Sequence, residues 1–170
     1  MYPQDEVKIA EARTVLQKRA RDNTRTPIQW NAAANAGFCP EGVQPWLRVN
    51  DDYRTINAEA QLETRETLSV FQFWQRLLQL RKKHVDVFIY GDFRLVDDQN
   101  PDVFAYQRIA GTRRWITVLN FTGKEVDWAM PETVVVRGWV VGNHHSTYST
   151  VARNGTIHIK PWEGLLGECT

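Results

Sequence analysis

The hydrophobic period of this chain changes near residue 85. Apolar residues between positions 64 and 84 recur at spacings of three and four, and the last turn is basic, which is typical of an amphipathic helix whose charges favour its carbonyl end. Beyond that point, short β-rich runs with a period of two alternate with turn signals. A chain of 170 residues can hold two such parts, so we predict a boundary that separates residues 1–85 from residues 86–170.

Short β-rich runs are expected to form the strands of the second part: 87–90, 93–96, 103–106, 115–119, 134–136 and 157–159. Turn-forming residues separate them, and Asn154-Gly155 between β-forming residues is typical of a hairpin. Strands this numerous and closely spaced indicate an antiparallel β-sandwich. The predicted fold class is therefore α+β, with a helical end-piece before an all-β antiparallel sandwich.

The first part combines one helix with a long aperiodic stretch. Residues 5–20 begin with acidic and end with basic side chains, and a thin apolar stripe between them predicts a short helix that depends on contacts outside itself. No period is visible over residues 21–63, although aromatic residues are scattered there: Trp30, Phe38, Trp46 and Tyr53. Such a long stretch is unusual in a compact domain, and its aromatic residues favour an ordered, packed loop with a function.

Charge and cysteine content exclude several classes of partner. Lys plus Arg is 21 and Asp plus Glu is 20, so the formal net charge of +1 favours neither nucleic acid nor an acidic membrane surface. No apolar run approaches the roughly 18 residues that span a bilayer, and the acidic N-terminus is not typical of a secretory signal. Cys39 and Cys169 give no metal-ligand spacing. We expect a cytoplasmic chain with reduced thiols, no metal and no other cofactor.

Common catalytic motifs are absent from the sequence, including the glycine-rich phosphate loop, the Gly-x-Ser-x-Gly elbow, His-Glu-x-x-His and Cys-x-x-Cys. The pair His144-His145 would point to opposite faces of a strand, so a loop or strand end is favoured over a metal site. Carboxylate pairs at 51–52 and 97–98 stand beside turn-forming residues, and Asx-turn chemistry explains both without catalysis.

The seven tryptophans of the chain allow two interpretations. An indole ring is a platform on which a sugar can stack, but it also fills a core efficiently, since one side chain buries about 150–250 Å². Trp74 and Trp115 fall on faces expected to be buried, so we assign both to the core. The sequence leaves Trp139 open between the two roles.

The segment 21–30 concentrates groups that suit recognition of a polar ligand. Two guanidinium groups, those of Arg21 and Arg25, stand four residues apart, and Asp22 and Asn23 are able to hold them by forked hydrogen bonds. Pro27 and Trp30 restrict the backbone that follows. A guanidinium held in this way can donate to sugar hydroxyls or to a carboxylate, or it can anchor the loop through a salt bridge.

A series of motifs extends this segment in a fixed order over residues 14–164. Segment 21–30 is followed by Asn35-Ala36-Gly37-Phe38, Pro45-Trp46 and the stretch 50–57. Further motifs lie at 70–74, 80–84, 89–93, 103–106, 119–121 and 160–164. Together they resemble the α-glucosidases of glycoside hydrolase family 13, particularly the fungal-type maltases and isomaltases.

The resemblance implies a specific place in a larger fold. In that family a (β/α)8 barrel carries the active site on the loops after its strands, and a β-sandwich follows the barrel. Residues 1–85 resemble the loop after the eighth strand and the last helix, and residues 86–170 resemble the C-terminal sandwich. The position of Arg21 matches an arginine that contacts the glucose in the −1 subsite, so Arg21 is the one substrate-binding residue that the resemblance implies. Arg25 is expected to brace the loop.

The same resemblance implies that the chain contains no catalytic residue. The family motifs of the nucleophile, Gly-x-Arg-x-Asp, and of the third acid, Asn-His-Asp, occur nowhere in the sequence. Residues 165–170 also depart from the family's Arg-(Ile/Val)-Tyr ending, which leaves a final strand in doubt.

Three hypotheses follow for the function. The first is the C-terminal portion of a retaining α-glucosidase that acts on terminal α-linked glucose, inactive without the missing barrel region. The alternatives are a stand-alone sugar-binding or scaffold module, and a remnant without a present function. Under the first, the partners are the barrel and an α-glucoside of the maltose or isomaltose type, and the α-1,4 or α-1,6 preference stays open.

Overall fold

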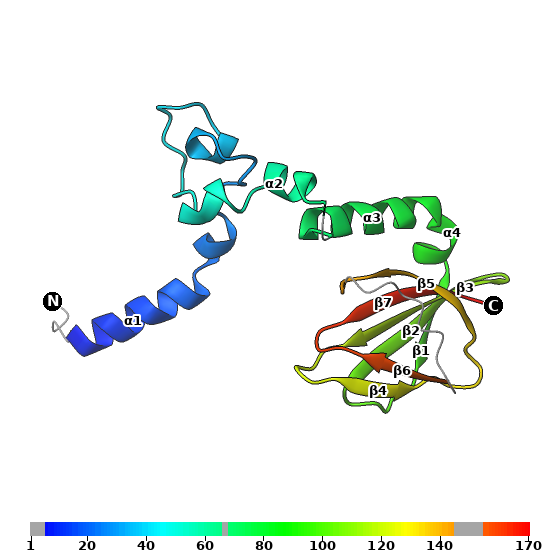
Figure 1. The fold of residues 1–170 in the computed structure, drawn as a ribbon. Coiled ribbons are helices and arrows are strands. Elements are labelled where there is room, and N and C mark those ends of the chain that lie inside the picture. The colour runs from blue at the N-terminus through cyan, green and yellow to red at the C-terminus, as the bar shows by residue number, and fades with distance from the viewer. Residues whose placement is uncertain (1–5, 66–67, 145–154) are drawn as a thin grey trace. The chain divides into compact units, whose positions relative to one another are not determined.

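The structure, a computed structural model, describes residues 6–65, 68–144 and 155–170 (Figure 1). It divides into two compact units, Met1–Thr64 and Arg65–Thr170. The helix around residue 75 therefore groups with the sheets that follow it. The predicted boundary between residues 85 and 86 stays a prediction. Within the described residues, no helix combines the length and the apolarity needed to cross a membrane.

The first unit is built from short helices and turns. Its elements are α1 (Glu6–Arg19), the 3-10 helices η1 (Arg21–Thr24), η2 (Ala34–Gly37) and η3 (Asp51–Arg54), and α2 (Ala58–Glu63). Helix α1 confirms the helix predicted over residues 5–20, and none of its residues is buried. Its dependence on contacts outside itself stays a prediction. Helix α2 begins where the Asn57 side chain accepts a hydrogen bond from the Ala60 amide.

The predicted helix over 64–84 is shorter in the structure than its pattern indicated. Helix α3 (Val70–Lys83) begins at a capping box, in which the Ser69 side chain accepts from the Gln72 amide and the Gln72 side chain accepts from the Ser69 amide. This cap satisfies amides at the first turn, so the helix begins there rather than at residue 64.

The run 87–90 was expected to be a strand, and this prediction is wrong. Residues Val85–Phe88 form the short helix α4, because the amides of Val87 and Phe88 both donate to the carbonyl oxygen of His84. A short apolar run has no period that separates a strand from a buried turn. Val87 is fully buried in this turn.

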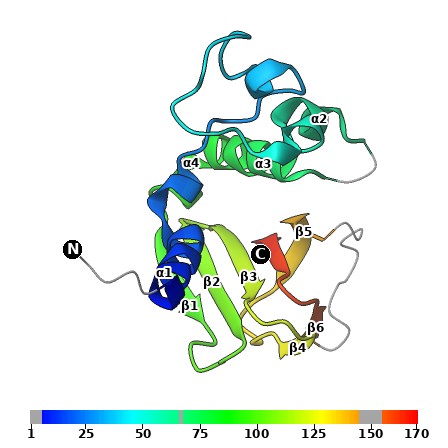
Figure 2. The ribbon, with the colours of Figure 1, turned by 90° about the vertical axis from the view of Figure 1, so that its left-hand side faces the viewer.

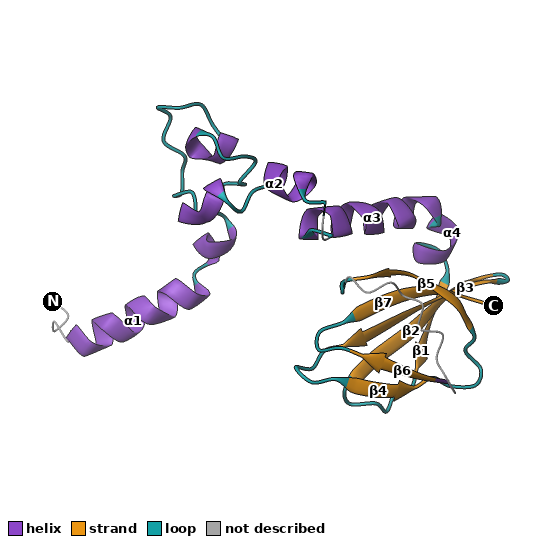
Figure 3. Ribbon diagram, viewed as in Figure 1, coloured by secondary structure: helices purple, strands orange, loops and turns teal. Residues whose placement is uncertain are grey.

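The second unit contains two antiparallel sheets that form a sandwich (Figures 2 and 3). The larger sheet has the order β1-β2-β3-β7-β5, with bounds Asp92–Val96, Val103–Ala110, Arg113–Asn120, Gly164–Cys169 and Val136–Gly142. The smaller pairs β4 (Val126–Ala129) with β6 (Thr156–Ile159). The core lies between them, where Trp128, Ile157 and Ile159 of the small sheet pack with Ile116, Val118 and Leu165. The antiparallel sandwich that the sequence predicted is therefore present.

Four of the predicted runs are strands: 93–96, 103–106, 115–119 and 157–159. The run 134–136 overlaps β5 only at Val136, and β4 was not predicted. The doubt about a final strand is resolved, since β7 lies between β3 and β5 and alternates between buried and half-buried residues. Asn154 of the predicted hairpin lies outside the described residues.

Candidate functional site

The loop that follows η1 turns sharply through three consecutive left-handed residues. Asn35, Ala36 and Gly37 have φ values of 52°, 55° and 68°. The amides of Trp30 and Asn31 both donate to the Ala36 carbonyl oxygen, at 2.9 and 3.2 Å. Because a left-handed conformation costs a residue with a Cβ about 1–2 kcal/mol, the surrounding contacts must stabilise the turn. This part of the loop is therefore rigidly constructed.

A second brace joins segment 21–30 to residues 50–57. The side-chain amide of Gln29 donates to the Ile56 carbonyl oxygen at 2.5 Å and to a carboxylate oxygen of Asp52 at 3.2 Å. Its Oε1 accepts from the side chain of Asn50 at 3.2 Å, and its backbone carbonyl oxygen accepts from the Ala58 amide at 2.9 Å. Two segments distant in sequence are thus fixed to each other by one glutamine.

The two guanidinium groups of the segment point to solvent. Neither Arg21 nor Arg25 has a hydrogen bond or ion pair from its side chain within the described part of the chain, so Asp22 does not fork to either one. The side chain of Asn23 lies outside what the structure describes. The Arg25 backbone carbonyl oxygen accepts from Trp46 Nε1 at 3.2 Å. Arg25 therefore contacts Trp46 through its backbone, and the substrate-binding role of Arg21 stays a prediction.

The pair 97–98 lies in a turn, as the sequence indicated, whereas the pair 51–52 lies in a 3-10 helix. Residues 51–52 open η3, and Asp97 has a left-handed φ of 57°. The Asp97 carboxylate accepts from Trp128 Nε1 at 2.8 Å and from the Asn100 side chain at 3.0 Å. Its function is structural, because it satisfies the indole N–H of a fully buried tryptophan.

The histidine pair and the cysteines form no metal site in the residues described. The Nε2 atom of His144 lies 3.2 Å from the Pro161 carbonyl oxygen, beyond the end of β5, and His145 lies outside the described residues. Cys39 and Cys169 are free thiols. Across residues 6–65, 68–144 and 155–170, no group of three or more His, Cys, Asp and Glu side chains could hold a metal ion.

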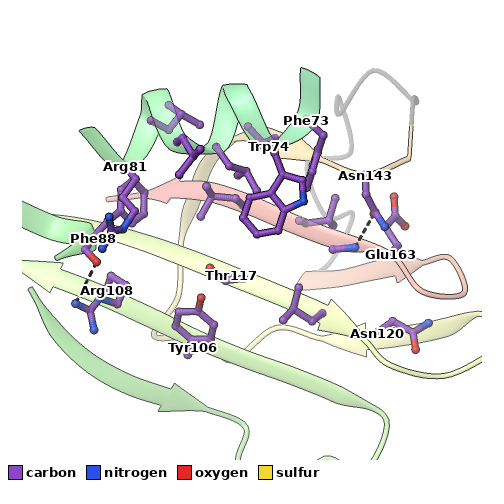
Figure 4. A pocket seen from close by; sticks show the side chains of 18 of the residues that line it. Phe73, Trp74, Arg81, Phe88, Tyr106, Arg108, Thr117, Asn120, Asn143 and Glu163 are labelled. Carbon is purple, nitrogen blue, oxygen red and sulfur yellow. Dashed lines mark hydrogen bonds between the residues drawn. The ribbon is translucent and has the colours of Figure 1, made fainter. Parts of the chain in front are cut away.

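An apolar groove of about 720 Å³ lies between α3 and the outer face of the large sheet (Figure 4). Its helix side includes Trp74, Leu77 and Leu78, and its sheet side includes Tyr106, Thr117 and Leu166. Trp74 is 59% exposed, so its assignment to the core is wrong, whereas Trp115 is buried as predicted. Trp139 is half-buried and packs against the core. A pattern of apolar spacing indicates a face, but it does not say whether another element covers that face.

Polar side chains at one end of the groove hold the loop between β6 and β7. Asn143 donates to the Trp162 carbonyl oxygen at 2.7 Å and accepts from the Gly164 amide at 2.8 Å. Trp162 has a left-handed φ of 57° and is 61% exposed. The buried carboxylate of Glu163 accepts from the Lys160 amide at 2.8 Å. Sequence reasoning missed these residues, although the motif at 160–164 had drawn attention to the loop.

Known proteins resemble nearly the whole of this chain. The family described as alpha amylase, catalytic domain, matches residues 2–91. An alpha-glucosidase of Schizosaccharomyces pombe is 34% identical over 158 residues, and the match covers 93% of this chain and 26% of that protein. An oligo-1,6-glucosidase of Parageobacillus thermoglucosidasius is 32% identical over 164 residues, which are 95% of this chain and 27% of that protein.

Solved structures also resemble most of this chain. The isomaltulose synthase PalI from Klebsiella sp. LX3 superposes with a TM-score of 0.75 at 32% identity, covering 88% of this chain and 26% of that chain. The chain spans about a quarter of the length of the curated relatives that it matches. In fold it is the last helix and loops of a (β/α)8 barrel followed by an antiparallel sandwich. Because the catalytic-domain family matches more than half of its residues, the chain belongs to the α-amylase family, glycoside hydrolase family 13.

Proposed function

We propose that the chain is the C-terminal portion of a retaining α-glucosidase that hydrolyses terminal, non-reducing α-linked glucose from maltose- or isomaltose-like sugars. The names of the relatives support this substrate class, since they include an alpha-glucosidase and oligo-1,6-glucosidases. The observation that carries the proposal is the Arg21 guanidinium, which has no partner among the described residues although the loop that follows it is held by many hydrogen bonds.

In this proposal Arg21 binds the glucose residue of the substrate. A guanidinium offers five N–H donors in a planar fork, which suits two adjacent sugar hydroxyls. The braces at Gln29 and Ala36 reduce the conformational entropy that would be lost when the loop orders around a ligand. A rigid loop with an unoccupied donor group at its start is therefore suited to a sugar subsite.

The chain by itself is expected to be inactive. A retaining glycosidase needs a nucleophilic carboxylate and an acid about 5–5.5 Å apart. The pair 51–52 lies in a 3-10 helix and the pair 97–98 in a turn, where Asp97 accepts a hydrogen bond from Trp128. The catalytic pair is therefore supplied by the barrel region, and the same region covers the apolar groove beside α3.

The test uses p-nitrophenyl α-glucoside with the chain alone and with a complete enzyme that carries it. We expect no turnover from the chain alone. In the complete enzyme we expect Arg21→Lys to lower kcat/KM, with a loss of transition-state stabilisation of about 1–3 kcal/mol. Arg25→Lys is the matched control and should leave kcat/KM nearly unchanged. Turnover by the pure chain that survives Arg21→Ala, or equal losses in both lysine variants, would contradict the proposal.

Titration calorimetry with maltose separates this proposal from a sugar-binding module. The exposed Trp162 is the observation that favours the module. Binding heat from the chain alone that disappears in Trp162→Ala would support that alternative. We place the protein in the cytoplasm as part of the proposal, because both thiols are free.

A further inference from the structure

The short helix α4 is fastened to the large sheet at its C-terminal end by Arg108 of β2. The Arg108 guanidinium donates to the carbonyl oxygens of Val87, Phe88 and Ile89 at 3.3, 3.4 and 3.2 Å. Figure 4 shows the hydrogen bond to Phe88. These are the last carbonyl groups of a helical turn, which have no partners within the helix. An arginine keeps its charge at all pH values of interest, so this attachment does not depend on pH.

A second arginine, Arg113 of β3, holds the other end of α4. One of its nitrogen atoms donates to the Asp86 carboxylate at 2.6 Å, and another contacts Nδ1 of His84. The second contact needs the neutral form of the imidazole, because only an unprotonated Nδ1 can accept from a guanidinium N–H. Of the two arginine attachments, only this one depends on a group that titrates near neutral pH.

His84 lies at the joint between α3 and α4. Its φ and ψ of −123° and 49° are not helical, and the chain changes direction there. The imidazole packs against the rings of Trp115 and Phe88, with centroids 5.0 and 6.1 Å away. A change at this ring is therefore transmitted both to the joint and to the sheet.

Burial and the surrounding charges together oppose the protonation of His84. Partial burial is the largest influence, followed by the cations Arg113 and Lys83, and together they lower the pKa of His84 below its ordinary value of 6.5. Asp86 on α4 and Glu168 on β7 act in the opposite direction. Once protonated, His84 faces the Arg113 guanidinium as a second cation and no longer accepts its hydrogen bond.

We propose that His84 and Arg113 form a pH-sensitive latch that holds the joint between α3 and α4 on strand β3. The neutral imidazole closes the latch, and protonation opens it. The pKa of His84 is lower in the folded chain than in the unfolded chain, because folding disfavours the protonated imidazole. The latch therefore contributes stability above pH 6.5, and this stability is lost as the pH falls from 6.5 toward the pKa of His84 in the folded chain. Helix α3 forms one wall of the apolar groove, so opening the latch loosens that wall.

Hydrogen exchange on the full chain at about pH 7.5 and about pH 5, corrected for the intrinsic exchange rate, tests the latch. We expect the amides of residues 80–90 to lose protection at the lower pH relative to those of β3. In His84→Asn the side-chain oxygen replaces Nδ1 as acceptor at both pH values, so the loss should disappear. Unchanged protection in the wild type, or the same loss in His84→Asn, would overturn the proposal.

An imidazole NMR titration gives a readout that does not depend on the folding of His84→Asn. Arg113→Met should raise the midpoint of His84, whereas Arg108→Met should leave it in place while loosening α4 equally at both pH values. His158 is an internal control, because its hydrogen bond to Asp127 raises its pKa above 6.5 and neither arginine contacts it. A His84 midpoint that does not respond to Arg113→Met would also overturn the latch.

Discussion

At the scale of single residues, asparagine side chains organise the irregular parts of this chain. Asn35 donates to the carbonyl oxygens of Pro40 and Val43 at 3.0 and 2.9 Å. Asn120, which is buried, donates to those of Lys124 and Lys160 at 2.8 and 2.9 Å. A side-chain amide carries both donors and an acceptor, so it can satisfy backbone groups that no helix or sheet pairs.

The turn at Gly37 provides a prediction at this scale. A Cβ on Gly37 would lie 2.6 Å from Asn31 Oδ1, an atom that accepts from the Ala33 amide at 3.0 Å. Gly37→Ala should therefore destabilise the loop by more than the about 1–2 kcal/mol that a left-handed alanine costs. Hydrogen exchange at the amides of Trp30 and Asn31 measures the effect.

Gly42 is the matched control for this change. Its φ of 83° is also left-handed, but an added Cβ would have no neighbour within 4 Å. Gly42→Ala should thus show the conformational cost alone. Equal effects of the two alanine variants on exchange would mean that the contact with Asn31 does not matter.

At the scale of elements, the beginning of α3 depends on its cap rather than on its apolar pattern. The apolar series begins at Leu68, yet the helix begins at Val70, after the capping box of Ser69 and Gln72. Most of the apolar face of α3 is exposed, including Phe71, Trp74 and Leu78. Tertiary burial therefore contributes little to α3, and its local signals carry more of its stability.

Ser69→Ala should lower the stability of α3 by about 1 kcal/mol, because the Gln72 amide loses its acceptor. The measurement is the protection of α3 amides against hydrogen exchange, compared with the amides of β3. Ser69→Thr keeps the hydroxyl and should restore most of the loss. An alanine variant as protected as the wild type would show that the cap does not determine this end of the helix.

At the scale of the whole chain, the second unit has two faces of different character. The inner face of its large sheet packs on the small sheet around Trp128. The outer face borders the apolar groove beside α3. Exposed apolar areas of this kind mark surfaces that normally contact other polypeptide. This asymmetry agrees with a chain that spans about a quarter of its relatives.

The groove predicts that the chain alone binds a hydrophobic dye and associates at high concentration. Trp74→Lys should reduce the dye fluorescence and the association, because a charged side chain then stands in the apolar lining. Tyr90→Lys is the control, since Tyr90 is 81% exposed and does not line the groove. Size-exclusion chromatography with a dye titration measures both effects. A wild-type chain that remains a monomer and binds no dye would contradict this prediction.

The sequence by itself determined the features that depend on neighbours along the chain. These are helix α1, the period-two strands around Val103 and Trp115, the turn at the carboxylate pair 97–98, and the ordered motifs that identify the family. Each rests on spacing or on local hydrogen bonding, so a short window of residues contains the necessary information.

Only the tertiary structure decided the features that depend on distant partners. Strand β7 forms because β3 and β5 pair with it on both sides, although its own residues show no clear signal. The exposure of Trp74 depends on which polypeptide covers α3, and the His84 contact depends on the position of Arg113 on β3. Burial and electrostatic contact arise between segments far apart in the sequence, so no local pattern can specify them.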